Sequence, residues 1–155
     1  MRDFVHKVRA GWFAVVCFGI VAGCATAPGV HQFESTWALP HDFDEVWAAT
    51  IEVFAENRWP IANLEKDSGI IVSDWVSVGR EADYADCGQP GLAAVRGRQA
   101  RFNVFVRQRG EGLTLSVNTD FQEQRSWDRR TWFQDCASTG LLEADVYSMI
   151  LERTR

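Results

Sequence analysis

Cysteine is the residue type in this sequence whose side chain offers the most distinctive chemistry. A thiolate can bond covalently to a lipid, pair with a second thiol in a disulfide, or bind a metal ion. The chain has four cysteines, Cys17, Cys24, Cys87 and Cys136. No two of them form a Cys-x-x-Cys motif, and no histidine lies near Cys87 or Cys136 in the sequence to complete a zinc site. The chemistry expected of each cysteine therefore depends on the compartment that the chain enters.

Other side chains that could take part in catalysis are scattered along the chain. The three histidines, His6, His31 and His41, are not placed for a catalytic triad, and the sequence lacks a Gly-x-Ser-x-Gly motif and a phosphate-binding glycine loop. Asp83 and Asp86 flank Tyr84 and could bind a cation or act as paired carboxylates, but in a solvated loop such residues are more often surface charges. We therefore expect no enzymatic activity, no metal ion and no cofactor.

The N-terminal segment indicates the compartment. Residues 1–9 carry three basic side chains against one acid, and residues 10–22 follow without any charge. This order is typical of a secretory signal peptide. A helix needs roughly 20 apolar residues to cross the hydrocarbon core, so a permanent membrane span is the less favoured interpretation of this shorter run. We expect the chain to be exported.

The end of that segment, Val21-Ala22-Gly23-Cys24, resembles the bacterial lipobox. This resemblance implies that a lipid is attached to the Cys24 thiol and that a signal peptidase removes residues 1–23. An acylated Cys24 would anchor the protein in a membrane. In enteric bacteria Asp after the cysteine retains a lipoprotein in the inner membrane. This chain has Ala25 instead, which favours the outer membrane, with the domain in the periplasm.

Assigning Cys24 to lipidation leaves two cysteines in the exported domain, Cys87 and Cys136. An exported compartment is oxidising, so the simplest expectation is that these two form a disulfide. Two free buried thiols, or a metal or redox site, remain as alternatives.

Charge excludes one class of partner. The formal net charge is −5, and loss of the basic signal peptide would make the chain more acidic. We therefore expect no nucleic-acid or anionic-lipid surface. Residues 24–32 read as a short linker and residues 33–155 as a single domain, which is consistent with the chain length.

Periodicity in the first half of the domain predicts a strand, a helix and a hairpin. Residues 33–39 alternate like a strand, and residues 42–59 have apolar side chains at helical spacing, with Asp42 and Glu45 resembling a capping box. Residues 61–65 and 70–78 flank a Lys-Asp-Ser-Gly turn. In the second of these strands, the inner face is expected to hold Ile70, Val72, Val76 and Val78.

The second half predicts a long loop, two more strands and a closing helix. Residues 79–97 have little periodicity and read as a loop, whereas residues 98–109 and 113–122 alternate cleanly. The inner faces of the two strands hold Phe102, Val104, Val106, Leu113, Leu115, Val117 and Phe121. Residues 139–151 read as a helix with Thr139 as N-cap, Glu143 and Asp145 near its positive end, and an inner face of Leu142, Val146, Met149 and Ile150. The order β-α-β-β-β-β-α predicts an α+β two-layer sandwich, an antiparallel sheet with two helices on one face.

This element order, together with the segments FDEVWAATIEVFAENRW, IANLEKDSGIIVSDWV and CASTGLLEADVYSMI, resembles the BamC-like helix-grip domains of bacterial envelope lipoproteins. The resemblance covers roughly residues 33–151. It implies a non-catalytic envelope lipoprotein with one such domain, whereas BamC itself has two domains and a long N-terminal segment that clasps its partner.

A group of arginine and aromatic side chains is the strongest candidate for a partner-binding surface. Both residue types are enriched at binding hot spots. The group consists of Arg125, Trp127, Arg129, Arg130, Trp132 and Phe133. A strand with tryptophans packed inward and arginines outward would show the same composition, so structural packing stays open. Two functions follow: an accessory or scaffold subunit that binds another envelope protein, or a binding module for a lipid or other apolar ligand, which would need a dry cavity between sheet and helix.

Overall fold

The computed structural model describes residues 24–79, 83–110 and 112–154. The predicted signal peptide, residues 1–23, lies outside the described residues. The described chain contains, in order, β1 (Thr36–Leu39), α1 (Phe43–Glu56), β2 (Ile61–Glu65), β3 (Ile70–Ser73), β4 (Val76–Val78), β5 (Ala85–Asp86), β6 (Ala94–Arg109), β7 (Gly112–Trp127), β8 (Arg130–Ser138) and α2 (Leu141–Arg153).

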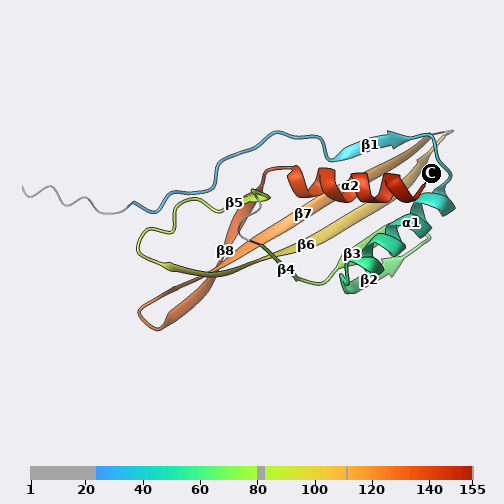
Figure 1. The fold of residues 1–155 in the computed structure, drawn as a ribbon. Helices are drawn as coiled ribbons and strands as arrows, with labels where there is room; N and C mark the ends of the chain where they lie inside the picture. The colour runs from blue at the N-terminus through green and yellow to red at the C-terminus, as the bar shows by residue number, and fades with distance from the viewer. Residues whose placement is uncertain (1–23, 80–82, 111, 155) are drawn as a thin grey trace, which may run out of the picture.

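The two long strands β6 and β7 form the centre of an open antiparallel sheet with the order β2-β3-β6-β7-β8-β5 (Figure 1). Each has 16 residues, and they pair from Ala94↔Ser126 to Arg109↔Gly112. β4 adds to β6, and β1 adds to β7. Every strand pair in the described chain is antiparallel.

The predicted α+β two-layer sandwich with two helices on one face is wrong: the protein is largely β. Residues 79–97, expected to be a loop, contribute β5 and the start of β6. Residues 123–138 complete β7 and form β8. The helices contact each other, and α1 also contacts β6 while α2 contacts β7. The β7–β8 hairpin extends well beyond the helices (Figure 1), so much of the sheet is uncovered by them.

Helix α1 packs its aromatic face on the sheet as its periodicity predicted, with Trp47 and Phe54 buried. The predicted capping box is wrong, because the Asp42 side chain makes no capping hydrogen bond and Glu45 lies instead 3.3 Å from a His41 ring nitrogen. The helix ends in a Schellman motif with Arg58 in the left-handed conformation, at φ 57°.

Alternation on β6 and β7 is confirmed: Phe102, Val104, Leu115 and Val117 are fully buried. Phe102 also packs against Phe54 of α1, with ring centroids 6.1 Å apart. Phe54, Trp59 and Phe102 together fill the space between α1 and the sheet.

The predicted inner face of residues 70–78 is wrong for its first half. Ile71 and Ser73 are buried, whereas Ile70 and Val72 are only half-buried. The strand breaks at Asp74, whose carboxylate accepts a hydrogen bond from the Trp75 amide. The break shifts the alternation of inward-facing side chains by one residue, so Val76, which was predicted to face inward, is buried.

Helix α2 begins one residue later than a Thr139 cap would place it. Gly140 is the N-cap, at φ 87°, and a Cβ there would lie 2.4 Å from the Phe33 ring. Thr139 donates its hydroxyl to the Asp83 carbonyl instead. Glu143 lies in the first turn of the helix, near its positive end as expected; it is buried and accepts a hydrogen bond from Ser138 at 2.8 Å.

Candidate functional site

The tip of the β7–β8 hairpin, residues 125–133, exposes aromatic side chains, and we call it the aromatic arm. Trp127 is 52% exposed, Trp132 39% and Phe133 52%. The two strands are joined by a two-residue turn in which Asp128 and Arg129 both have positive φ, at 40° and 66°. Such a turn favours Asn-Gly. An Asp-Arg turn gives no such signal, which is why the sequence did not predict the hairpin.

Strand register divides the arm into two faces. Arg125 lies opposite Trp132, and Trp127 opposite Arg130, on one face. Ser126 lies opposite Thr131, and Gln124 opposite Phe133, on the other. The first face therefore carries both tryptophans, and the second carries Phe133.

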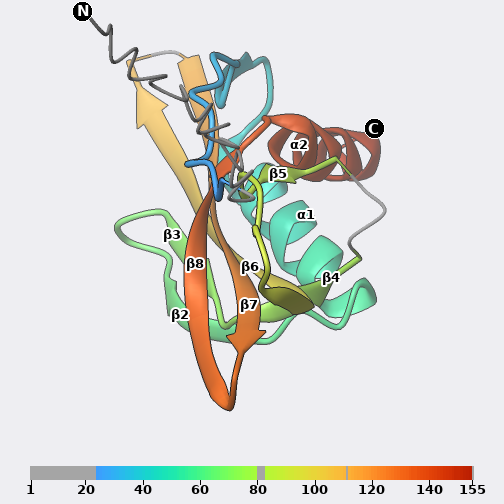
Figure 2. The same cartoon turned by 90° about the vertical axis from the view of Figure 1, so that its left-hand side faces the viewer.

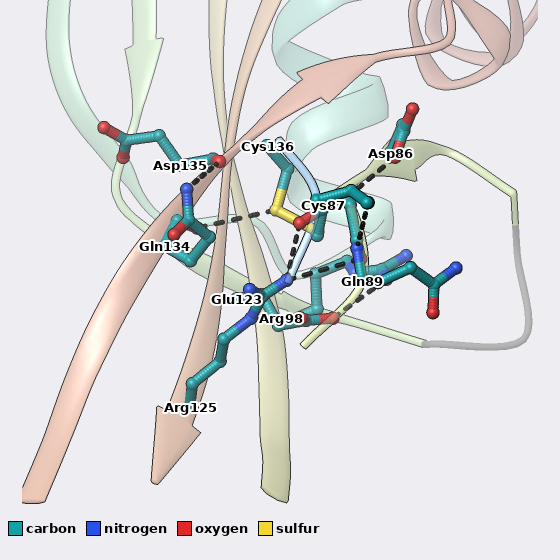
Figure 3. A network of polar contacts seen from close by, with 11 residues as sticks. Asp86, Cys87, Gln89, Arg98, Glu123, Arg125, Gln134, Asp135 and Cys136 are labelled. Atoms are coloured by element: carbon teal, nitrogen blue, oxygen red, sulfur yellow. Dashed lines mark hydrogen bonds and ion pairs between the residues drawn. A yellow bond between two sulfur atoms is a disulfide. The ribbon is translucent and has the colours of Figure 1, made fainter. Parts of the chain in front are cut away.

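Arg125 is not available to a partner, so its predicted place in the binding surface is wrong. It is 4% exposed, and its Nε donates to the Glu123 carboxylate at 3.0 Å. The other Glu123 oxygen accepts from Arg98 Nη2, also at 3.0 Å. This buried network lies at the base of the arm (Figure 3). Of the predicted group, Trp127, Arg129, Arg130 and Trp132 are exposed.

A disulfide joins Cys87 to Cys136 beside this network (Figure 3). It is the pairing that the sequence favoured over free thiols or a metal site. Arg125 also donates to the Cys87 carbonyl, and β5 pairs with β8 at Ala85↔Ser138. The base of the arm is thus held to the rest of the domain by the disulfide, by the hydrogen bond from Arg125 to Cys87 and by the pairing of β5 with β8.

Residues 24–32, the predicted linker, run beside the segment that carries Cys87. The Gly29 amide donates to Asp86 at 2.8 Å, and the Gln89 amide donates to Thr26 at 3.0 Å. Hydrogen bonds from the Gly88 and Gly29 amides, with a smaller contribution from His31, lower the pKa of Asp86. Asp86, weighed above as a cation ligand or surface charge, therefore fastens the linker to the domain.

Cys24 is exposed and its thiol is free, so nothing in the described chain blocks a reaction at its sulfur. The adjacent Ala25 lines an open groove of about 550 Å³ between the linker and the arm. We call this the anchor-side groove. It is also lined by Leu92, Trp127, Arg130 and Trp132. Leu92, which is 72% exposed, was not among the predicted binding residues. The one feature of the sequence that could have indicated it is an apolar side chain directly after Pro90-Gly91.

A second hollow, of about 460 Å³, opens beside α2, between that helix and the residues just after α1, Asn57 and Trp59. Trp59, Phe102 and Met149 line it, and the Tyr84 hydroxyl at its edge donates to Asp145 at 2.7 Å. That hydrogen bond and the burial of the phenol raise the pKa of Tyr84.

The described residues offer neither a metal site nor a membrane-spanning helix. No group of three or more His, Cys, Asp or Glu side chains there could hold a metal ion. No helix in the same residues is long and apolar enough to cross a membrane.

No family model matches the chain, and no curated protein matches it. The resemblance to BamC-like lipoproteins therefore rests on the sequence segments quoted above, and it stays a prediction.

Proposed function

We propose that this protein is a non-catalytic lipoprotein, anchored through Cys24 at the periplasmic face of the outer membrane, that binds another envelope protein as an accessory or scaffold subunit. The aromatic arm is the binding surface.

One observation carries this proposal: the arm exposes Trp127, Trp132 and Phe133 on a hairpin whose base is fixed. The buried hydrogen bond from Arg125 to the Cys87 carbonyl and the Cys87–Cys136 disulfide hold that base. A fixed surface loses little conformational entropy on binding, so more of the contact energy contributes to affinity. Aromatic side chains beside exposed arginines have the composition of binding hot spots.

The arm can be tested by photo-crosslinking in cells. A photoreactive phenylalanine analogue at Phe133 should yield a discrete adduct with one protein. The matched control is the same analogue at Gln108, an exposed position at the opposite end of β6. Adducts of the same size from both positions, or none from Phe133, would contradict the proposal.

The anchor can be tested separately. Cys24→Ser should abolish acyl labelling and release the protein from the membrane fraction. Unchanged labelling of this variant would rule out Cys24 as the lipidation site.

Binding of an apolar ligand is a second candidate, supported by the hollow beside α2. Trp59, Phe102 and Met149 give it apolar surface, whereas Asp145 and Glu152 line its polar part, and its volume falls in the range of small-molecule sites. Native mass spectrometry of the purified protein should then detect a bound lipid that is lost in Met149→Trp. No adduct in the unaltered protein would argue against this candidate.

A further inference from the structure

We propose that the anchor-side groove is a membrane-contact surface, where Leu92, Trp127 and Trp132 enter the boundary between headgroups and acyl chains of the bilayer that holds Cys24. This inference rests on the proposed lipid anchor and adds to it an orientation of the domain.

Position is the first argument. Ala25, which follows the candidate lipidation site, lines the groove together with both tryptophans. The Gln89–Thr26 hydrogen bond keeps this part of the linker against the domain. Residues 24–27, the loop after β5 and the tip of the β7–β8 hairpin lie at one end of the molecule, away from the C-terminus (Figures 1 and 2). A bilayer that holds an acylated Cys24 is therefore next to the groove.

Side-chain chemistry is the second argument. Tryptophan concentrates at membrane–water boundaries because its ring is largely apolar while its N–H needs a polar partner. Trp127 and Trp132 lie on the groove face of the arm, and Leu92 adds an exposed aliphatic side chain. Exposed apolar side chains that gather on one surface mark an interaction site more clearly than scattered ones.

The charged groups indicate the kind of lipid surface. Arg130 lines the groove, and Arg129 lies in the adjoining turn beside Asp128. Long arginine side chains can bury their methylene groups while the guanidinium reaches lipid phosphates. The whole chain is nevertheless acidic, with a net charge of −5. Apolar insertion rather than attraction to anionic lipid therefore accounts best for the groove, and zwitterionic lipid suffices.

The two faces of the arm can then serve two partners. The groove face, with Trp127 and Trp132, turns to the membrane. The membrane contact therefore narrows the protein-binding surface proposed above to the opposite face, which carries Phe133. An envelope protein that binds this face would lie close to the bilayer.

Depth-dependent fluorescence quenching tests the proposal. The mature protein is extracted from membranes and reconstituted in phosphatidylcholine vesicles with or without brominated acyl chains, which quench tryptophans at the acyl boundary. The brominated vesicles should quench the emission of two of the six tryptophans that follow residue 23. Trp127→Phe combined with Trp132→Phe should abolish this quenching. Trp75→Phe is the control, because Trp75 is half-buried under Arg101, and it should leave the quenching in place.

Each outcome supports or overturns the proposal that the groove contacts the membrane. Equal quenching in the double variant and the unaltered protein would overturn the proposal, as would no quenching in either. Blue-shifted emission without bromine quenching would mean that an acyl chain of Cys24 itself fills the groove, which also overturns it. The intact mass of the same sample reports the acyl groups, so a failure of the lipid anchor is distinguished from a failure of the groove.

Discussion

Arg125 donates through Nε to Glu123 at 3.0 Å, with both side chains buried at the base of the exposed arm. Removing a buried donor leaves its acceptors without a hydrogen bond, which is more costly than the loss of an exposed ion pair. Glu123 keeps Arg98, so no lone charge remains, but Arg125→Met leaves one Glu123 oxygen and the Cys87 carbonyl without their donor. We expect it to lower the free energy of unfolding by about 3 kcal/mol. Urea unfolding measures this change.

The matched control for this prediction is Arg101→Met. Arg101 pairs with Asp120 at 2.9 Å, but their side chains are 42% and 51% exposed, far more than those of Arg125 and Glu123. Its loss should cost less than about 1 kcal/mol. Equal losses for the two variants would mean that the buried pair contributes no more than a surface pair.

The disulfide should contribute through loop closure. It joins residues separated by 49 positions, and a cross-link of that span restricts the unfolded chain by about 4 kcal/mol. The double variant Cys87→Ala with Cys136→Ala should unfold at correspondingly lower urea, whereas Cys24→Ser should leave the midpoint unchanged. A midpoint unaffected by the double substitution would refute the prediction.

Substitutions in the turn at the tip of the arm should stabilise the protein. Arg129 adopts a positive φ that its side chain does not favour, whereas Asp128 is among the residues that tolerate one. Asp128→Asn with Arg129→Gly should raise the free energy of unfolding by about 1 kcal/mol, since it relieves this strain. Arg130→Gly, at the first residue of β8, should instead destabilise the protein. Thermal unfolding compares the two, and a loss in both would mean that the turn is not strained.

Stability should depend on pH through Glu143. Burial raises the pKa of its carboxyl, partly offset by the Ser138 hydrogen bond. The folded state therefore holds the proton more tightly than the unfolded chain. The resulting stability is fully present below the ordinary glutamate pKa of about 4.3 and is lost as the pH rises through the raised value.

Unfolding measured from acidic to neutral pH should thus show the unaltered protein losing stability relative to Glu143→Gln. Ser138→Ala removes the hydrogen bond that lowers the pKa, so it should extend this loss to higher pH. A constant difference between the unaltered protein and Glu143→Gln at all pH values would contradict the assignment.

Asp86 should control the attachment of the linker. Hydrogen bonds from Gly88 and Gly29 lower its pKa and stabilise the carboxylate. Hydrogen exchange should find the Gly29 amide protected at neutral pH and less protected as the pH falls through that lowered pKa. Asp86→Asn should reduce the protection at neutral pH, whereas Asp83→Asn should not. Equal exchange in all three proteins would show that Asp86 does not fasten the linker.

Much of the central sheet was predictable from alternation alone. Phe102, Val104, Leu115 and Val117 repeat every second residue, and a side chain two positions on must face the same way in a strand. The face of α1 that carries Trp47 and Phe54 followed from its helical period in the same manner.

The candidate site was only partly predictable, because burial of charge depends on partners that are distant in the sequence. Arg125 was predicted in a binding surface, yet it is buried beside Glu123. The position of Glu143 near the start of its helix gave no sign that it would be buried with Ser138 as its donor. The anchor-side groove combines Ala25, Leu92 and the arm, three segments that only the tertiary fold brings together. The lipidation site, by contrast, was proposed from local sequence alone.

The fastening of the linker has a consequence for how far the domain could travel. If residues 24–32 were a free extended linker, these nine residues would allow the domain to lie up to about 30 Å from its anchor. The first hydrogen bond to the domain is made at Thr26, however, so only about 7 Å of free chain separates it from Cys24. With Cys24 acylated, the domain would therefore stay at the bilayer surface instead of extending into the periplasm. It could bind only partners that approach this surface.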